Sequence, residues 1–281
     1  MRPGQTRSVT ADEIERFRAD GVVHLTAILD TAMLIALEPA IDEMLVGSTV
    51  ADLSEMSDQL AGAESVTAAG RGRFRSGVDH WLVDDRFAHF ACDGPLPEIV
   101  AGLLGSHTVH LYEDSLLVKE PGTVERTAFH TDLSYFQVDG DLICTTWVPF
   151  DPAGPENGAV TYVRGSHRWK REFRPNLFVT DDPIPGTEGE LIPDITGRHG
   201  GELIEVRSVP GDVVVHHART VHGASANTST ATRRRALSVR YCGDDTVVKF
   251  RRGAPRKAFH DDWTGGGSID HKLCPLVWSD R

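Results

Sequence analysis

The sequence predicts a mainly β protein with flanking helices, built around an antiparallel sandwich or jelly roll. Between residues 107 and 245, short β-branched or alternating runs follow one another, each bounded by Gly, Pro, Asp or Asn. No helical pattern separates these runs, which favours antiparallel strands over a parallel βαβ sheet. No linker divides this stretch either, so we expect one domain spanning residues 1–281.

The N-terminal support, residues 1–106, is expected to be helical. In "TADEIERFRADG", Thr10 is a predicted N-cap and Glu13 completes a capping box, which together favour a helix. Gly21 should end that helix, because glycine readily adopts the left-handed conformation found at helix C-termini. A short strand is then predicted at 22–25.

A second helix is predicted over residues 30–45. Leu34, Leu37 and Ile41 recur there at helical spacing and form an apolar face suited to packing on a sheet. "PLPEIVAGLLG" at 95–105 predicts another short helix.

Strands are then expected to follow in quick succession. The predicted runs are "TVHLYEDSLLVKE" (108–120), "DLICTTWVPF" (141–150), "AVTYVRGSH" (159–167), "ELIEVRSV" (202–209), "DVVVHHA" (212–218) and "RALSVRYC" (235–242). Together they form the predicted core, 107–245.

Three segments lack a sustained pattern. Residues 47–80 are small and polar, and we expect a long loop or lid, since structureless loops of that length are usually functional. Residues 170–200 combine prolines with polar residues and are predicted to be an insertion over the barrel mouth. Residues 246–281 form a C-terminal extension.

Composition excludes several classes of function. The formal net charge of −12 argues against binding nucleic acid or an anionic membrane surface. No run approaches the ~18 apolar residues of a membrane span. The four cysteines are scattered without a C-x-x-C pair, and the N-terminus lacks an apolar signal region, so a cytoplasmic location is expected.

Basic residues are concentrated in three short runs. These are "RGRFR" at 71–75, "RRR" at 233–235 and "KFRRGAPRK" at 249–257. In an acidic chain such runs are usually solvated, but the first and third also suggest an anionic small-molecule substrate.

A candidate metal site begins with His130 and Asp132 in "FHTD". Residues i and i+2 of a strand point to the same side, so an imidazole and a carboxylate can face one point. A third ligand is expected from "GDVVVHHARTVHGASAN", which contains His216, His217 and His222. With His222, which follows an apolar strand, the set becomes two histidines and one carboxylate. That set suits non-heme Fe(II), because it leaves three coordination positions open.

An arginine cluster follows the last histidine. "RRRALSVRY" begins eleven residues after His222 and places Arg233, Arg234 and Arg235 at the start of a strand. An oxygenase that uses a 2-oxoacid needs a cation for the far carboxylate, and arginine can bind it with two parallel hydrogen bonds. The alternative is that these arginines are exposed charges at a strand edge.

The chain resembles the phytanoyl-CoA dioxygenase family of Fe(II)/2-oxoglutarate oxygenases over residues 115–243. The matching segments are "VKEPGTVERTAFHTDLSYF", "TTWVPFDPAGPENGAVTYVRGSH", "PGDVVVHHARTVHGASANTS" and "RRRALSVRY". The resemblance implies a double-stranded β-helix (jelly roll, cupin-like) core. It also implies that His130, Asp132 and His222 hold iron and that a following arginine binds 2-oxoglutarate.

The family usually has two basic residues before the alanine of this last strand, whereas this chain has three. Counting back from Ala236 selects Arg234 as the residue that binds 2-oxoglutarate, and counting forward from His222 selects Arg233. Strand register favours Arg234, which would face inward with Ala236 and Ser238.

Weaker candidates surround this centre. Trp147 is expected beside the co-substrate or in the core, and Lys119 near an anionic group or in solvent. His217 matches a position that is often histidine in the family, which suggests either a hydrogen bond to the ligands or plain packing. Ser166 and His167 in "RGSH" are expected to form a turn.

The resemblance implies an Fe(II)- and 2-oxoglutarate-dependent dioxygenase of secondary metabolism. Such an enzyme uses O₂, with ascorbate as reductant in vitro, releases succinate and CO₂, and oxidises an unactivated C–H bond of a small molecule. Because Asp132 is present, hydroxylation is expected rather than halogenation, and desaturation, epoxidation and ring closure stay open as alternatives because they use the same oxidant. The alternatives are a Zn²⁺- or Fe²⁺-dependent hydrolase, lyase or isomerase on a similar barrel, and a binding protein without catalysis.

Overall fold

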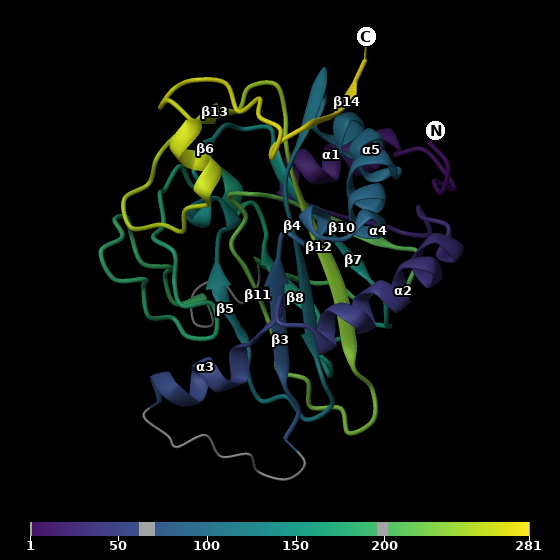
Figure 1. The fold of residues 1–281 in the computed structure, drawn as a ribbon, viewed down its shortest axis with the longest axis vertical. Coiled ribbons are helices and arrows are strands. Elements are labelled where there is room, and N and C mark those ends of the chain that lie inside the picture. Colours follow the sequence, from purple (N-terminus) through teal and green to yellow (C-terminus); the bar gives the residue numbers. More distant parts are fainter. Residues whose placement is uncertain (1, 62–70, 196–201, 281) are drawn as a thin grey trace.

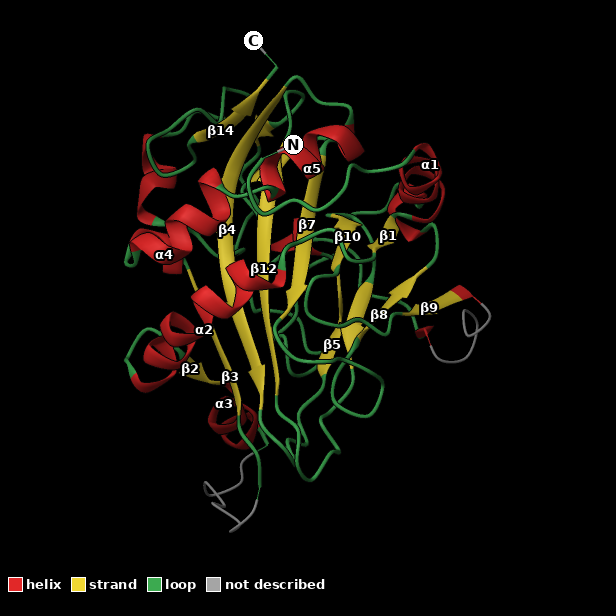
Figure 2. Ribbon diagram, turned by 90° about the vertical axis from the view of Figure 1, so that its right-hand side faces the viewer, coloured by secondary structure: helices red, strands yellow, loops and turns green. Residues whose placement is uncertain are grey.

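Two antiparallel sheets face each other in a jelly roll, and helices cover the outer face of the larger sheet (Figure 1, Figure 2). The computed structural model describes residues 2–61, 71–195 and 202–280. In the part of the chain so described, no helix is both long enough and apolar enough to cross a membrane.

The larger sheet carries most of the predicted strands. Its order is β1-β10-β7-β12-β4-β3-β2, with β14 also paired to β4. The bounds are β1 (Val22–Leu25), β10 (Val213–His217), β7 (Ile143–Pro149), β12 (Arg234–Cys242), β4 (Thr108–Lys119), β3 (Phe74–Val78), β2 (Ala51–Asp52) and β14 (Leu276–Ser279). The C-terminal extension therefore returns to the sheet through β14.

The smaller sheet has the order β5-β11-β8-β9. Its strands are β5 (Thr127–His130), β11 (His222–Ala224), β8 (Val160–Val163) and β9 (Leu203–Glu205). A further pair joins β6 (Val138–Asp139) to β13 (Val247–Val248). The predicted runs at 159–167 and 202–209 thus contain strands, but shorter ones than expected.

The helices confirm the N-terminal predictions. They are α1 (Ala11–Asp20), α2 (Thr31–Val46), α3 (Leu53–Leu60), α4 (Asp85–Ala88) and α5 (Leu96–Leu104), with short helical turns η1 (His80–Leu82), η2 (His89–Asp93), η3 (Asp132–Tyr135), η4 (Ser166–Arg168) and η6 (Ala258–Asp262). Thr10 and Glu13 form the predicted capping box, and Gly21 ends α1 in the left-handed conformation with φ 76°.

Alternation along the strands separates the apolar core from the site. In β12, Leu237 and Val239 pack against the helices in the main core, whereas Ala236 faces the smaller sheet. In β10, Val215 joins the main core and Val214 faces inward. The inward positions between the sheets are therefore the ones that carry the polar candidates.

The prediction of a long loop at 47–80 is wrong for its described part. Residues 51–60 form β2 and α3, and residues 74–78 form β3, which pairs with β4 along its whole length. Phe74 is fully buried in this strand. Residues 62–70 lie outside the described part of the chain. The strand forms because β4 offers a free edge, which a local pattern does not reveal.

Candidate metal centre and co-substrate pocket

His130 and His222 lie opposite each other on neighbouring strands. β5 ends at His130, β11 begins at His222, and the two residues are paired in the register of the smaller sheet. Asp132 begins η3, two residues after His130. All three side chains are buried. The structure therefore brings together the three residues that the spacing singled out.

The three side chains direct ligand atoms at one point. Nε2 of His130 lies 3.6 Å from Oδ1 of Asp132, and Nε2 of His222 lies 3.7 Å from the same oxygen. The three ligand atoms all lie within 4.8 Å of one another. These separations are those of atoms that share one metal ion about 2 Å from each.

Backbone carbonyls fix the tautomer of both histidines. Nδ1 of His130 is 2.8 Å from the carbonyl oxygen of Ala128, and Nδ1 of His222 is 2.9 Å from that of Thr220. Because a carbonyl only accepts, each Nδ1 carries the proton and donates it. Each Nε2 is left with a free lone pair toward the shared point, as a metal ligand requires.

The protonation states of the three side chains suit a cation. Burial by itself raises the pKa of Asp132, but His222, His130 and His216 outweigh it and hold that pKa well below its usual value. Burial, together with the neighbouring His216 and His130, lowers the pKa of His222 well below its usual value. The carboxylate is therefore ionised and the imidazole neutral at neutral pH, which are the forms that bind metals.

Two further side chains orient the carboxylate of Asp132 through the oxygen that does not face His130 and His222. Thr145 donates from its hydroxyl to Oδ2 of Asp132 at 2.5 Å, and Nε2 of His216 lies 3.1 Å from the same oxygen. His216 and Thr145 are register partners on β10 and β7. Oδ2 is thus held by the larger sheet while Oδ1 faces the two histidines.

His216, rather than His217, is the histidine that contacts the ligand set. His217 points to the other side of β10, where its Nε2 lies 2.9 Å from the carbonyl oxygen of Asp141. The expectation that His217 could hydrogen-bond to the ligands is therefore wrong. The alternation of β10 is the signal that distinguishes the two, but choosing the inward face requires knowing the partner strands.

Ser166 and His167 lie in the expected turn, η4. Ser166 donates to the carbonyl oxygen of Val163 at 2.7 Å and accepts from the backbone N–H of Val221 at 2.8 Å. The turn therefore also holds the residue just before His222. His167 lies near the carbonyl oxygen of Arg18 and takes no part in the site.

Arg234 lines the same pocket as the three ligands. Its side chain is buried, and Nη1 donates to the carbonyl oxygen of Leu117 at 3.1 Å. Its Nε has no hydrogen-bond partner, and among residues 2–61, 71–195 and 202–280 no carboxylate forms an ion pair with it. Burial lowers its pKa to about 10, so the guanidinium stays charged at neutral pH.

Lys119 is a second buried basic residue beside Arg234. The two residues are register partners on β4 and β12, and Nζ of Lys119 donates to the carbonyl oxygen of Ser225 at 2.6 Å. Burial and the charge of Arg234 lower the pKa of Lys119 well below its usual value. Lys119 is fully buried, so the alternative that it is solvated is wrong. An anion bound beside these two buried basic groups would favour their charged forms.

The remaining arginine-cluster residues face outward, and Trp147 faces inward. Arg233 pairs with Asp42 at 2.9 Å on the surface. Arg235 pairs with Asp151 at 2.8 Å and also with Glu38. Trp147 is buried, lines the ligand pocket, and has its ring centroid 5.9 Å from the Arg234 guanidinium carbon.

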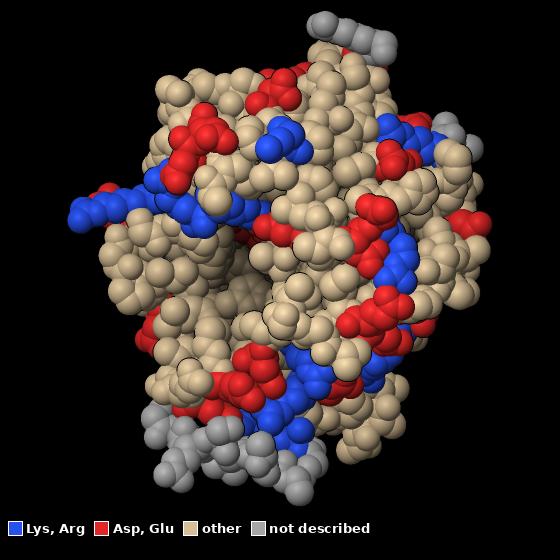
Figure 3. All heavy atoms as spheres, in the orientation of Figure 1, with Lys and Arg blue, Asp and Glu red and all other residues tan. Residues whose placement is uncertain are grey.

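A cavity of about 540 Å³ opens beside this pocket. Figure 3 shows a hollow in the face of the molecule that carries β3. The cavity and the ligand pocket share four lining residues, which are His130, Asp132, Phe178 and Arg240. Phe178 comes from the 170–200 insertion and has a left-handed backbone, with φ 68°. Such strain in a non-glycine residue is typical of functional sites.

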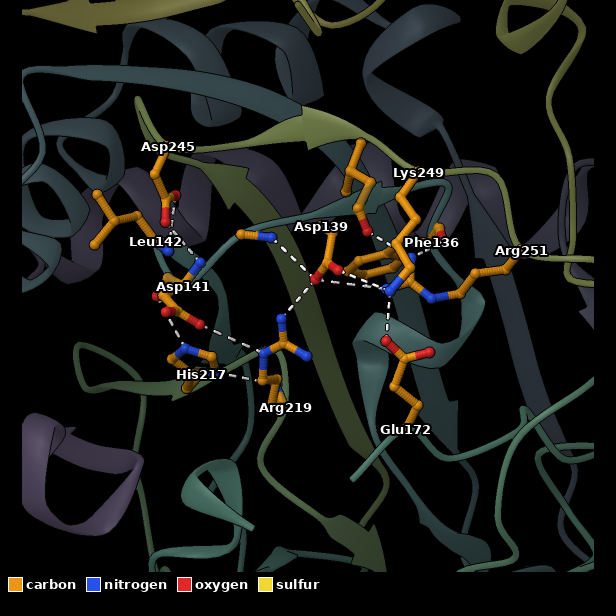
Figure 4. Close-up of polar contacts among 12 residues, drawn as sticks. Phe136, Asp139, Asp141, Leu142, Glu172, His217, Arg219, Asp245, Lys249 and Arg251 are labelled. Carbon is orange, nitrogen blue, oxygen red and sulfur yellow. Dashed lines mark hydrogen bonds and ion pairs between the residues drawn. The ribbon is translucent and has the colours of Figure 1, made fainter. Parts of the chain in front are cut away.

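An ion-pair cluster ties together the segments that carry the ligands (Figure 4). Asp139 accepts from Arg219 at 2.5 Å and from Lys249 at 2.9 Å, and Arg251 lies 3.6 Å away. Lys249 also contacts Glu172 of the insertion. The cluster therefore joins the chain after Asp132, the loop before His222, and the C-terminal extension.

Two imidazole nitrogens and one carboxylate oxygen within reach of one point make a set suited to a divalent transition metal with open positions. Arg234, whose Nε–H has no partner among the described residues, lines this pocket, and Lys119 is its register partner on β4. The site therefore fits a metal together with a small chelating anion, beside a larger cavity for a second molecule.

Comparison with known proteins agrees with this geometry. A family model described as phytanoyl-CoA dioxygenase matches residues 17–236. A probable phytanoyl-CoA dioxygenase of Caenorhabditis elegans is 28% identical over 175 residues, covering 58% of this chain and 53% of that protein. The chain thus matches about half the length of this curated relative.

Two solved structures share the fold over nearly the whole chain. The non-heme alpha ketoglutarate dependent carbocyclase SnoK from nogalamycin biosynthesis has a TM-score of 0.72 at 23% identity, covering 98% of this chain and 99% of that one. The epimerase SnoN, in complex with Fe³⁺, alpha ketoglutarate and nogalamycin RO, has a TM-score of 0.68 at 23% identity, covering 95% and 98%.

Proposed function

This chain belongs to the phytanoyl-CoA dioxygenase family, and on that premise we propose that it is an Fe(II)- and 2-oxoglutarate-dependent dioxygenase. The proposed reaction is hydroxylation of an unactivated C–H bond of a small-molecule metabolite, with release of succinate and CO₂. One observation carries the proposal: Arg234, a buried cation that no carboxylate of the described residues pairs with, lines the same pocket as two histidines and a carboxylate arranged for one metal.

In this proposal His130, Asp132 and His222 hold the iron. Iron, 2-oxoglutarate and O₂ together supply the oxidising power for attack on a C–H bond. The chain's own part is to keep the ligand atoms oriented: two backbone carbonyls hold the imidazoles, and Thr145 and His216 hold the carboxylate.

Arg234 is the proposed partner of the distal carboxylate of 2-oxoglutarate. Its guanidinium is already desolvated and offers donors that no described protein acceptor uses, so a carboxylate gains two charge-assisted hydrogen bonds there. Lys119 is a second basic group next to it, whose charged form a bound carboxylate would favour, and Trp147 forms the neighbouring wall. A Lewis-acid hydrolase would have no use for this desolvated cation, which favours the oxygenase over that alternative.

Hydroxylation is assigned because Asp132 keeps a carboxylate in the ligand set, which distinguishes hydroxylating from halogenating relatives in the family. A small-molecule substrate of secondary metabolism is supported by the fold shared with SnoK and SnoN, both tied by description to nogalamycin. The cavity of about 540 Å³ beside the ligands is large enough for such a molecule.

The proposal is tested by adding 2-oxoglutarate to Fe(II)-loaded protein without O₂. A visible charge-transfer band should develop and saturate at one equivalent of 2-oxoglutarate per bound iron. Addition of O₂ and ascorbate should then release succinate, slowly in the absence of substrate. Absence of the band from protein shown to hold iron would contradict the proposal, and metal-dependent hydrolysis by the same protein without succinate release would favour the hydrolase alternative.

A further inference from the structure

Most cations of the two basic runs that suggested an anionic substrate form ion pairs with acidic side chains in the folded chain. The pairs are Arg71 with Asp58 and Glu125, Arg73 with Asp52, Lys249 and Arg251 with Asp139, Arg252 with Glu188, Arg256 with Asp261, and Lys257 with Asp79 and Glu113. In these two runs only Arg75, which donates to the carbonyl oxygen of Leu45, has no carboxylate partner among the described residues, so the runs offer few unpaired cations to an anion.

The wall of the 540 Å³ cavity is itself balanced in charge. Nζ of Lys257 lies 2.5 Å from Asp79 and 2.9 Å from Glu113, and Nη1 of Arg240 lies 3.5 Å from Glu113. Lys257 and Arg240 thus face two carboxylates, and the third cation lining the cavity, Arg256, pairs with Asp261. Burial, with the nearby Lys257 and Arg256, lowers the pKa of His260 to about 4, so this wall residue is uncharged at neutral pH.

Arg240 has hydrogen-bond donors that the protein does not use. Its side chain is buried, with 8% of its surface exposed, and both Nε and Nη1 lack a hydrogen-bond partner in the described part of the chain. The contact with Glu113 is an ion pair too long for a strong hydrogen bond. Unused buried donors are costly, and an acceptor on a ligand would satisfy them.

Arg240 also stands between the ligand pocket and the cavity. It lines both, and its register partner on β7 is Thr145, which hydrogen-bonds to Asp132. A substrate oxygen bound to Arg240 would therefore lie next to the carbon presented to the metal.

The rest of the cavity wall is rich in aromatic rings. Four aromatic side chains, from β4, the segment after Asp132 and the insertion, line it: Tyr112, Tyr135, Phe136 and Phe178. Flat aromatic walls bind ring systems well, because stacked or edge-on rings add attraction to the area that they bury.

From these observations we infer that the substrate is an uncharged, ring-bearing molecule with a hydrogen-bond-accepting oxygen, and that Arg240 binds that oxygen beside the metal. The inference rests on the proposed function, because it assigns a substrate class to that same site. It excludes substrates whose anionic group must enter the cavity, since Glu113 and Asp79 already neutralise the two cations and would repel it.

A matched pair of probes tests this assignment. 2-(Hydroxymethyl)anthraquinone is uncharged, whereas anthraquinone-2-carboxylate has the same rings and a negative charge. Binding is followed by quenching of protein fluorescence, without O₂, in protein loaded with Fe(II) and 2-oxoglutarate and again in metal-free protein. The uncharged probe should bind at least about tenfold more tightly than the carboxylate.

Three variants test whether Arg240 is the residue that binds the uncharged probe. Arg240→Gln should weaken the uncharged probe about tenfold while the 2-oxoglutarate titration stays within about twofold. Arg256→Gln removes a cation from the rim of the same cavity and should change probe binding less than about twofold. Glu113→Gln leaves Arg240 unbalanced and should strengthen the carboxylate probe about tenfold, a gain that misfolding does not produce.

Three results would overturn the inference: no binding of the uncharged probe up to its solubility limit, tighter binding of the carboxylate probe to the unaltered protein, or unchanged probe binding by Arg240→Gln. A missing 2-oxoglutarate band with probe binding intact would instead contradict the proposed function, so the two failures are distinguishable.

Discussion

Nε2 of His216 lies 3.1 Å from Oδ2 of Asp132, on the side of the carboxylate that faces away from the other two ligand candidates. Only this imidazole and the Thr145 hydroxyl, 2.5 Å away, hold that oxygen among the described residues. We expect His216→Leu to lower iron affinity about 10- to 100-fold, because the carboxylate loses one of its two restraints. Competition with a chromogenic chelator would measure the change.

The adjacent His217→Gln provides a matched control, since His217 faces the opposite side of β10 and should leave iron affinity unchanged. Thr145→Val removes the other restraint, and the double variant with His216→Leu should lose more affinity than either single change. Equal iron affinity of His216→Leu and the unaltered protein would show that Thr145 alone orients the carboxylate.

Arg234 and Arg233 are neighbours in sequence but differ completely in environment. Arg234 is buried in the ligand pocket, whereas Arg233 pairs with Asp42 on the surface. Arg234→Ala should raise the 2-oxoglutarate concentration for half-saturation about 100-fold, because a desolvated charge-assisted contact is lost. Arg233→Ala should change it less than about twofold. Anaerobic titration of the visible band measures both, and similar effects would contradict the assignment of Arg234.

The strand runs and the ligand spacing were predictable because they are local. His130 and Asp132 face the same point because Thr131 between them is extended, although Asp132 already begins η3. The inward direction of Arg234 needs only the alternation with Ala236. The apolar periodicity of α2 is equally local. These features depend on neighbouring residues in the chain and on little else.

The predictions that the structure contradicts all concern residues whose contacts lie far away in the sequence. β3 forms because β4 pairs with it, and the sequence around Phe74 carries no local strand pattern, so a loop was predicted there. His216 differs from His217 only through its partners on β7 and η3. The basic runs looked like an anion site, but Asp139 and Glu113 approach them from distant segments.

Asp132 is the only carboxylate in the candidate ligand set. Asp132→Ala leaves two imidazoles, and we expect iron binding to weaken by at least about 100-fold, with loss of 2-oxoglutarate-dependent succinate release. The exposed Asp141→Ala is the surface control, and iron stoichiometry after gel filtration is the measurement. Retention of one tightly bound iron by Asp132→Ala would show that the metal lies elsewhere.

Asp139 contacts three cations from two segments, Arg219 on one and Lys249 and Arg251 on the other (Figure 4). Asp139→Asn would leave them facing one another, so we expect a loss of about 1–3 kcal/mol in the free energy of unfolding. This is less than for a fully buried charge, because the side chains are partly exposed. Asp181→Asn, in an exposed pair with Arg126, should change stability by less than about 0.5 kcal/mol in the same urea titration.

His217 should make the fold sensitive to acid, because both ring nitrogens are used by the neutral form. Nε2 donates to the carbonyl oxygen of Asp141 at 2.9 Å, and Nδ1 accepts from the backbone N–H of Arg219 at 3.0 Å. Burial, with His167 nearby, lowers the pKa of His217 from 6.5 to about 4. Protonation of Nδ1 in the folded chain would break the second hydrogen bond.

The sign of the pH effect follows from that depressed pKa. Between about pH 6.5 and 4 the unfolded chain binds a proton that folded His217 does not, so the free energy of unfolding falls as the pH falls through this range. At pH 5 the expected loss from this residue is about 2 kcal/mol relative to pH 8. His217→Gln retains a donor and an acceptor without titrating, so urea midpoints at pH 8 and pH 5 should differ less in this variant than in the unaltered protein. The exposed His89→Gln should preserve the full difference, and equal pH dependence in His217→Gln and the unaltered protein would show that other groups cause the acid sensitivity.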